Sequence, residues 1–123
     1  MLILDTSTII EILKDTEKGN RISEFIQGQE AAITSFSVHE LMIGAKEREI
    51  TRLEMFFASV KIFSFDLMAA LESWRLEKNL IKGGKTIEES DIFIAGICLA
   101  ANAKLITLDK GFEGVKSLDV KFF

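Results

Sequence analysis

Two short stretches with the same pattern decide the fold: Met1-Leu2-Ile3-Leu4-Asp5 opens the chain, and Leu105-Ile106-Thr107-Leu108-Asp109 lies near its end. Each is a short, mainly apolar run, typical of a buried strand, and each ends in an aspartate. Between them, apolar residues recur at helical spacing in several segments, separated by further short apolar runs. Strands that alternate with helices predict an α/β fold with a mostly parallel sheet and helices on both faces.

The pattern places each expected element along the chain. We expect strands over residues 1–4, 31–34, 60–65, 105–108 and 120–123, the last at an edge of the sheet. Helical spacing indicates helices within 9–13, 22–26, 38–45, 50–58, 67–76 and 92–101. The last of these is almost entirely apolar, which predicts burial on all sides and makes Cys98 a core residue. No repeat, linker or low-complexity tract interrupts the chain, so we expect one domain over residues 1–123.

Composition narrows the class of protein. The chain has 123 residues, of which 48% are hydrophobic and 28% charged, as is typical of soluble globular domains. No apolar run approaches the ~20 residues that span a bilayer, and we expect no signal peptide. A single cysteine allows no internal disulfide and favours the cytoplasm. The net charge of −4 argues against a passive nucleic-acid binder, although not against an enzyme that recruits cations to meet phosphates.

Four acidic residues are candidates for one site. Asp5 and Asp109 each follow a parallel strand, so both should lie at the ligand-binding edge of the sheet. Asp91 lies in the first turn of the apolar helix, where a carboxylate is costly unless it is paired or bound to a metal. Glu40 stands one turn into its own helix. Converging carboxylates with no basic partner repel one another, and hard cations such as Mg²⁺ or Mn²⁺ relieve that repulsion.

Each acid also has a purely structural explanation. Asp5 could cap a helix, Asp91 could complement a helix dipole, and Asp109 could begin a turn. Glu40 could form a capping box with Ser37. These separate explanations do not predict that two of the acids share one sheet edge, so the metal site is the favoured interpretation.

Four segments of the chain together resemble the PIN-domain family in order and spacing. They are Leu4-Asp5-Thr6-Ser7-Thr8-Ile9-Ile10, Ser37-Val38-His39-Glu40-Leu41-Met42-Ile43-Gly44, Asp91-Ile92-Phe93-Ile94-Ala95 and Leu105-Ile106-Thr107-Leu108-Asp109-Lys110-Gly111-Phe112. Any one of them is common by chance, but four in order across almost the full chain are specific. Within the family, the chain is similar to the VapC-like toxins of VapBC toxin–antitoxin modules.

The resemblance implies a three-layer α/β/α sandwich with a sheet of about five strands. It implies a metal-dependent endoribonuclease that hydrolyses single-stranded RNA, often as a homodimer inhibited by a cognate antitoxin. Asp5, Glu40, Asp91 and Asp109 would be its catalytic residues and would bind one or two Mg²⁺ or Mn²⁺ ions. Either Glu40 or Asp109 would orient the attacking water, and the sequence does not choose between them.

Other polar residues near the four acids have expected roles as well. By similarity, Thr6 and Thr107 hydrogen-bond a carboxylate or a coordinated water, with a local strand-end hydrogen bond as the alternative. His39, the only histidine, is adjacent to one of the acids, and adjacent side chains on a helix point about 100° apart. We therefore do not expect it at the metal, nor a Ser–His–Asp hydrolase. Lys110 is the basic residue expected to meet an RNA phosphate.

Several alternatives remain open at this level. A PIN nuclease could process RNA without an antitoxin, or a PIN fold could be catalytically silent and act as an interaction module. A response-regulator receiver would use Asp66, which follows the strand 60–65, as its phosphoacceptor. Trp74, Leu67 and Leu71 are expected mainly in the core, with an antitoxin groove or dimer contact as the alternative. The terminal pair Phe122-Phe123 would suggest a partner if both were exposed.

Overall fold

The computed structural model describes residues 1–123 and contains all the strands and helices that the pattern predicts. The strands are β1 (Leu2–Leu4), β2 (Ala31–Thr34), β3 (Lys61–Phe63), β4 (Lys104–Thr107) and β5 (Val120–Phe122). The helices are α1 (Thr6–Leu13), α2 (Glu17–Ile26), α3 (Ser35–Gly44), α4 (Ile50–Ser59), α5 (Leu67–Lys82) and α6 (Glu89–Ala100), with the short 3₁₀ helices η1 (Glu47–Glu49) and η2 (Lys110–Gly114). β3 is shorter than the expected strand over residues 60–65.

The five strands form one sheet in the order β3-β2-β1-β4-β5, and every neighbouring pair is parallel. β5 lies at an edge, as predicted. The chain builds outward from β1 to β3 and then crosses back to place β4 on the other side of β1. This reversal makes the carboxyl ends of β1 and β4 the place where open parallel sheets bind ligands. Leu4 pairs with Ile106, so the residues that follow, Asp5 and Thr107, come side by side.

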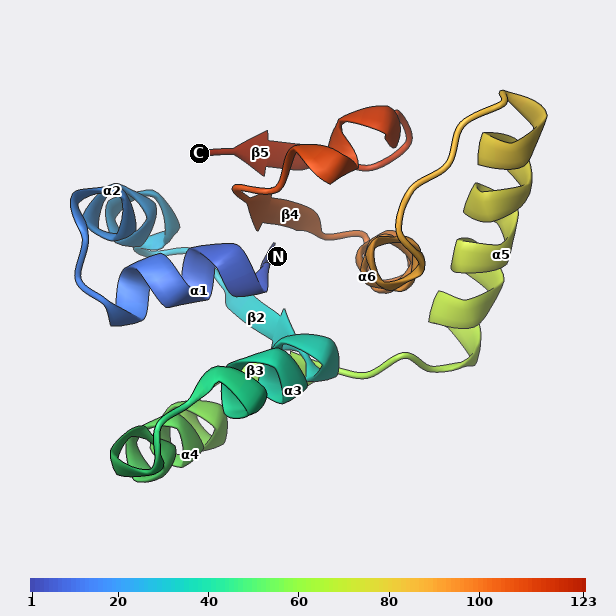
Figure 1. Cartoon of the computed structure of the whole chain (residues 1–123). Helices are drawn as coiled ribbons and strands as arrows, with labels where there is room; N and C mark the ends of the chain where they lie inside the picture. Colours follow the sequence, from blue (N-terminus) through green and yellow to red (C-terminus); the bar gives the residue numbers. More distant parts are fainter.

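Two apolar layers cover the sheet because successive strand residues point to opposite faces. Ile3 and Leu105 pack in one core cluster, whose helical members come mainly from α5 and α6. Leu4 and Ile106 belong to the other cluster, which α1, α2, α3 and α4 close. Figure 1 shows α5 and α6 together on one side and α1 and α2 on the other. The three-layer α/β/α arrangement is confirmed.

The α6 helix is the best-buried helix of the chain, as its composition predicts. Six of its apolar or small residues are almost inaccessible to solvent, and its only glycine lies against α5. A Cβ atom at Gly96 would stand 2.6 Å from the carbonyl oxygen of Ala69, which explains how the two helices approach so closely. Cys98 is fully buried, and burial raises the pKa of its thiol to about 12. It is a core residue with no nucleophilic character.

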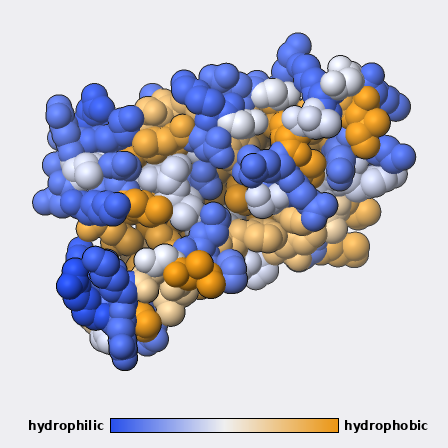
Figure 2. All heavy atoms as spheres, viewed as in Figure 1, coloured by the Kyte–Doolittle hydropathy of each residue, from blue (hydrophilic) through white to orange (hydrophobic).

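Some apolar side chains face solvent against expectation. Leu67 is 72% exposed and Trp74 is 57% exposed, so placing these two in the core was wrong. Both lie on the outer surface of α5, where only one side of the helix meets α6. Figure 2 shows a mostly hydrophilic face with separate hydrophobic patches. None of the helices combines the length and the apolar character that crossing a bilayer requires.

Candidate active site at the ends of β1, β4 and α6

Asp5 is held by hydroxyl groups at the carboxyl end of β1. Its side chain is mostly buried, and its Oδ2 accepts hydrogen bonds from Thr107 Oγ1 at 2.7 Å and from Ser7 Oγ at 3.3 Å. Burial raises the pKa of Asp5, while these hydrogen bonds act in the opposite direction. Asp5 occupies the N-cap position of α1, but its carboxylate makes no capping hydrogen bond. The helix-cap explanation of this side chain is therefore wrong.

Two hydroxyls tie the end of β4 to the same carboxylate. Thr107 Oγ1 donates to Asp5 and accepts from the backbone N–H of Asp109 at 2.9 Å. Ser7 Oγ also donates to Asp5, and it accepts from the backbone N–H of Leu108 at 3.1 Å. Because both hydroxyls act as donor and acceptor, the turn after β4 is positioned relative to Asp5.

Asp109 begins the turn of η2, as the structural explanation of this residue predicts. Its Oδ1 accepts the backbone N–H of Gly111 at 2.8 Å, and the side chain remains exposed. A Cβ atom at Gly111 would lie 3.0 Å from this Oδ1 and 3.0 Å from Asp91 Oδ2. The carboxylates of Asp109 and Asp91 therefore flank the same glycine, and any side chain there would press on both.

Asp91 is buried without the side-chain hydrogen bonds that Asp5 accepts. The residue is 8% exposed in the first turn of α6, and no side chain donates a hydrogen bond to its carboxylate. Burial raises the pKa of Asp91 to about 6, and the negative charges of Asp109, Asp5, Glu88 and Glu40 add to the rise. The other three predicted acids thus all act electrostatically on Asp91.

Glu40 joins the group through α3. Its Oε1 accepts a hydrogen bond from Thr6 Oγ1 at 3.0 Å, and the same hydroxyl lies 2.8 Å from Ser37 Oγ. The predicted capping box is wrong, because Thr34 caps α3 instead and accepts the backbone N–H of Ser37 at 3.3 Å. Glu40 is consequently free of the helix end and turns toward α1.

A pocket of about 300 Å³ opens beside Asp91 and Asp109. Its remaining lining residues come from the segment before α6 and from η2, and they are Thr86, Ile87, Glu88 and Gly111. Sequence reasoning missed Glu88 as a member of this site, although its position three residues before Asp91 would have placed it one helical turn away. None of the four predicted acids forms an ion pair with a lysine or arginine. No three acidic, histidine or cysteine side chains stand close enough to hold one metal ion as they are placed.

A second cavity, of about 230 Å³, lies on the other side of Glu40. Half of its ten lining residues are apolar, among them Leu13, Leu41 and Leu53. Its charged residues are two cations, Lys14 and Arg52, and two acids, Glu40 and Glu49. We call this cavity the α1–α3–α4 groove, and one of its lining residues is a candidate catalytic carboxylate.

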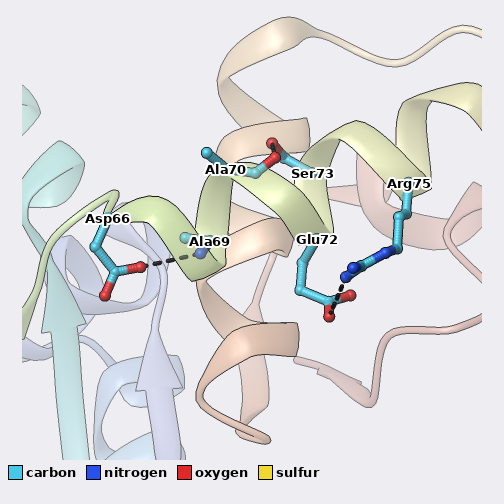
Figure 3. A network of polar contacts seen from close by, with 6 residues as sticks. All are labelled: Asp66, Ala69, Ala70, Glu72, Ser73 and Arg75. Atoms are coloured by element: carbon cyan, nitrogen blue, oxygen red, sulfur yellow. Dashed lines mark hydrogen bonds and ion pairs between the residues drawn. The ribbon is translucent and has the colours of Figure 1, made fainter.

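The other predicted polar residues lie apart from the pocket. His39 is exposed and makes no hydrogen bond with Glu40. Lys110 forms an ion pair with Glu113 at 3.6 Å, and its contact with RNA stays a prediction. Asp66 Oδ1 accepts the backbone N–H of Ala69 at 2.9 Å and caps α5, as Figure 3 shows. A carboxylate engaged in this way is a structural cap, which removes the basis of the receiver interpretation.

Comparison of the sequence and of the fold with known proteins identifies a family and several relatives. Residues 2–118 match the family model described as "PIN domain". The chain is 26% identical to a Salmonella typhimurium protein named tRNA(fMet)-specific endonuclease VapC, over 97% of this chain and 95% of that protein. It is 27% identical to ribonuclease VapC1 of Haemophilus influenzae, over 94% and 92% of the two chains. Among solved structures, one of VapBC2 from Rickettsia felis bound to a promoter DNA fragment superposes with a TM-score of 0.83 at 25% identity, covering 99% of this chain and 98% of that one.

Proposed function

The chain belongs to the PIN-domain family, and on this premise we propose that it is a metal-dependent endoribonuclease, a hydrolase of single-stranded RNA. In this proposal one PIN domain spans residues 1–123, and the protein is the toxin of a VapBC-type toxin–antitoxin pair acting in the cytoplasm. The observation that carries the proposal is the buried Asp91 carboxylate. It is surrounded by further acids and has no cationic side chain to balance them.

The residues present fit a divalent cation. Asp5, Glu40, Asp91 and Asp109 supply only carboxylate oxygens, the donors that Mg²⁺ and Mn²⁺ prefer. Burial and, after it, the charges of the neighbouring acids raise the pKa of Asp91, and a cation bound among them would act against this rise. Asp91 and Asp109 would be the first residues to hold such a cation, because a carboxylate oxygen of each lies 3.0 Å from the position of a Cβ atom on Gly111.

Each residue then has a separate task in phosphodiester hydrolysis. A bound cation supplies Lewis-acid chemistry that favours ionisation of water and offsets charge on the phosphate. Thr107 and Ser7 keep the Asp5 carboxylate in one orientation. Glu40 and Asp109 each engage one oxygen in a hydrogen bond and keep the other free, so either can orient the attacking water.

The substrate and partner proposals are supported by the relatives. The similar Salmonella and Haemophilus proteins are named as an endonuclease and a ribonuclease, and their similarity extends along nearly the whole chain. The Rickettsia structure contains a VapBC pair, which supports a cognate antitoxin for this chain. The α1–α3–α4 groove is the surface we assign to that antitoxin, because it leads directly to Glu40. The homodimer expected from the family resemblance stays a prediction, to be measured by analytical ultracentrifugation.

Cleavage of RNA tests the proposal directly. The purified chain should cut single-stranded RNA in Mg²⁺ or Mn²⁺ and stop when EDTA removes the cation. Asp91→Asn and Asp5→Asn should each lower the cleavage rate by at least about 100-fold, since even the residues that only support metal ligands cost 10–100-fold when changed.

Asp15→Asn is the matched control. Asp15 is exposed and has a positive φ of 56°, a conformation that asparagine also tolerates, so this change should leave cleavage unaltered. Circular dichroism must show that all three variants are folded. Cleavage that persists in EDTA, or in both site variants, would contradict the proposal.

The two alternative functions predict different results. A silent interaction module would bind Mn²⁺ yet cut no RNA from any source. A processing nuclease without an antitoxin would cut RNA, but affinity capture on the chain would retain no small protein that blocks the cleavage.

A further inference from the structure

The outer surface of α5 carries a hollow that the proposed chemistry does not use. It measures about 530 Å³ and lies over the C-terminal half of the helix. Its lining residues are Trp74, Arg75, Lys78, Asn79 and Lys82. We call this set the α5 basic hollow. Three of the five residues are cationic and none is acidic, in a chain whose net charge is −4.

Trp74 is the only tryptophan of the chain, and its side chain is 57% exposed. An indole is a large apolar surface to leave in water, and it has no aromatic partner within the protein. A flat, exposed aromatic ring among cations is the arrangement on which single-stranded nucleic acids stack their bases.

The cations of the hollow are arranged along the helix beside this ring. Trp74, Lys78 and Lys82 follow at intervals of four residues, so they form one stripe about 12 Å long. Lys78 and Lys82 form no ion pair, whereas Arg75 is held by Glu72 at 3.0 Å on the same helix. Figure 3 shows this pair on α5. The two free lysines leave their charge available to an anionic partner.

The hollow is connected to the acidic pocket by a short piece of chain. Lys82 lines the hollow and Thr86 lines the pocket, and the residues between them are Gly83, Gly84 and Lys85. Four residues of chain span at most about 14 Å, so the backbones of Lys82 and Thr86 lie no farther apart than that. Figure 1 shows this segment running from the end of α5 toward α6. The hollow and the pocket therefore each include a residue within this short reach of the other.

We propose that the α5 basic hollow binds the single-stranded RNA substrate beyond the bond that is cut. One base stacks on the Trp74 indole, and the neighbouring phosphates meet Lys78 and Lys82. The inference rests on the proposed ribonuclease function and adds what that function lacks, a cationic surface beside a strongly acidic centre. An acidic segment of a protein would satisfy the lysines but leave the ring without a flat partner, so RNA is the better match.

The fluorescence of Trp74 reports directly on binding at the hollow, because the chain has no other tryptophan. The wild-type chain in EDTA, which prevents cutting, should be titrated with a 12-nucleotide oligouridylate. We expect saturable quenching of the Trp74 fluorescence by stacking. An abasic ribose-phosphate oligomer of the same length should bind with little quenching.

Variants separate the stacking from the charge. Trp74→Ala should weaken oligouridylate binding about tenfold by fluorescence anisotropy with a labelled oligomer, and Trp74→Phe should restore most of it. The double change Lys78→Glu and Lys82→Glu should lower the slope of log affinity against log salt by about 1.4, since each phosphate contact contributes about 0.7. Lys61→Glu is the control, because Lys61 is an exposed lysine that begins the edge strand β3 and does not line the hollow, and its slope should equal that of wild type.

The outcomes distinguish this inference from the function on which it rests. If the chain cuts RNA but bound oligouridylate leaves Trp74 emission unchanged, and Trp74→Ala binds as well as wild type, the hollow is not the RNA site. If Trp74 emission depends on protein concentration and not on RNA, the hollow contacts a second copy, which also overturns the inference. If no RNA is bound at all, both proposals fail. Quenching together with the loss of affinity in Trp74→Ala supports the inference even where no cleavage is seen.

Discussion

The end of β1 and the first turn of α6 each contribute a buried aspartate, yet the surroundings of the two carboxylates are opposite in character. Asp5 and Asp91 are both 8% exposed. Asp5 accepts hydrogen bonds from Thr107 and Ser7, which oppose the effect of burial on its pKa. Asp91 accepts no side-chain hydrogen bond, and its neighbours are other acids that raise its pKa further, to about 6.

This difference shows what each region contributes to the site. The strand ends provide an oriented ligand whose position comes from hydrogen bonds across two paired strands. The helix provides a carboxylate that no side chain hydrogen-bonds, among other acids whose charges a bound cation would offset. The first region should therefore respond to loss of a hydroxyl, and the second to packing, to pH and to metal.

Among changes that leave the four acids in place, the largest effect is expected from the hydroxyl that positions Asp5. Thr107→Val keeps the β-branched shape but removes the donor to Asp5 and the acceptor for the backbone of Asp109. Loss of such a supporting contact should lower RNA cleavage by about 10–100-fold. The control is Thr51→Val, an exposed threonine of α4, which should cut at the wild-type rate. Full activity in Thr107→Val would show that Asp5 needs no orientation.

Packing is the next test, because it places Asp91. In Gly96→Ala the new Cβ would meet the Ala69 carbonyl oxygen at 2.6 Å and push α6 away from α5. We expect about 1–3 kcal/mol loss of unfolding free energy in urea, together with weaker Mn²⁺ binding. Gly44→Ala is the matched control, since a Cβ there meets nothing within 4 Å and stability should hold or rise slightly. Equal stability of the two variants would contradict the close packing of α5 and α6.

The sequence predicted the two regions unequally well. An aspartate at the end of a buried strand can be placed from the residue pattern alone, and the pattern assigned both Asp5 and Asp109 to the sheet edge. Asp5 directly follows β1, whereas β4 ends at Thr107, one residue earlier than expected, so Leu108 separates it from Asp109. The hydrogen bond from the Thr6 hydroxyl to Glu40 joins residues on separate helices. Local sequence patterns do not predict a contact of this kind. The capping box failed for that reason, because Thr34 takes the helix end and a tertiary contact takes Glu40.

The same limit applies to exposure and to strand length. Trp74 has the helical spacing of a core residue, but α5 meets the rest of the protein on one side only, so the ring remains in solvent. β3 ends earlier than its apolar run because it is an edge strand with β2 as its single neighbour. Both outcomes depend on which elements pack together, and a local pattern does not contain that information.

The pH dependence of the unfolding free energy tests the environment of Asp91. A carboxyl whose pKa is raised on folding binds more protons in the folded state, so its contribution favours folding below its unfolded pKa and is lost as the pH rises through about 6. In EDTA, wild type should therefore lose about 1–2 kcal/mol relative to Asp91→Asn between pH 4 and pH 7. Urea unfolding of both proteins across this range measures it. A difference that does not vary with pH would show that Asp91 is not perturbed.

The smallest effect is expected at the edge of the pocket. The charge of Glu88 contributes to the raised pKa of Asp91, so Glu88→Gln should lower that pKa. Because a metal ligand must be deprotonated, the midpoint of Mn²⁺ affinity against pH should move down by about a few tenths of a unit. Glu89→Gln, one residue along the chain, is the control and should not move it. An equal shift of the midpoint in both variants would show that it comes from the overall surface charge and not from the position of Glu88.

The central claim is that four carboxylates from the ends of β1 and β4, from α3 and from α6 form one metal-binding site. Anomalous diffraction from a crystal of the wild-type chain soaked in Mn²⁺ tests it most directly. The account predicts one or two peaks coordinated by oxygens of Asp5, Asp91 and Asp109, with Glu40 beside them, and no peak at this position in Asp91→Asn. A manganese peak elsewhere, with these four side chains unmoved and unbound, would contradict it.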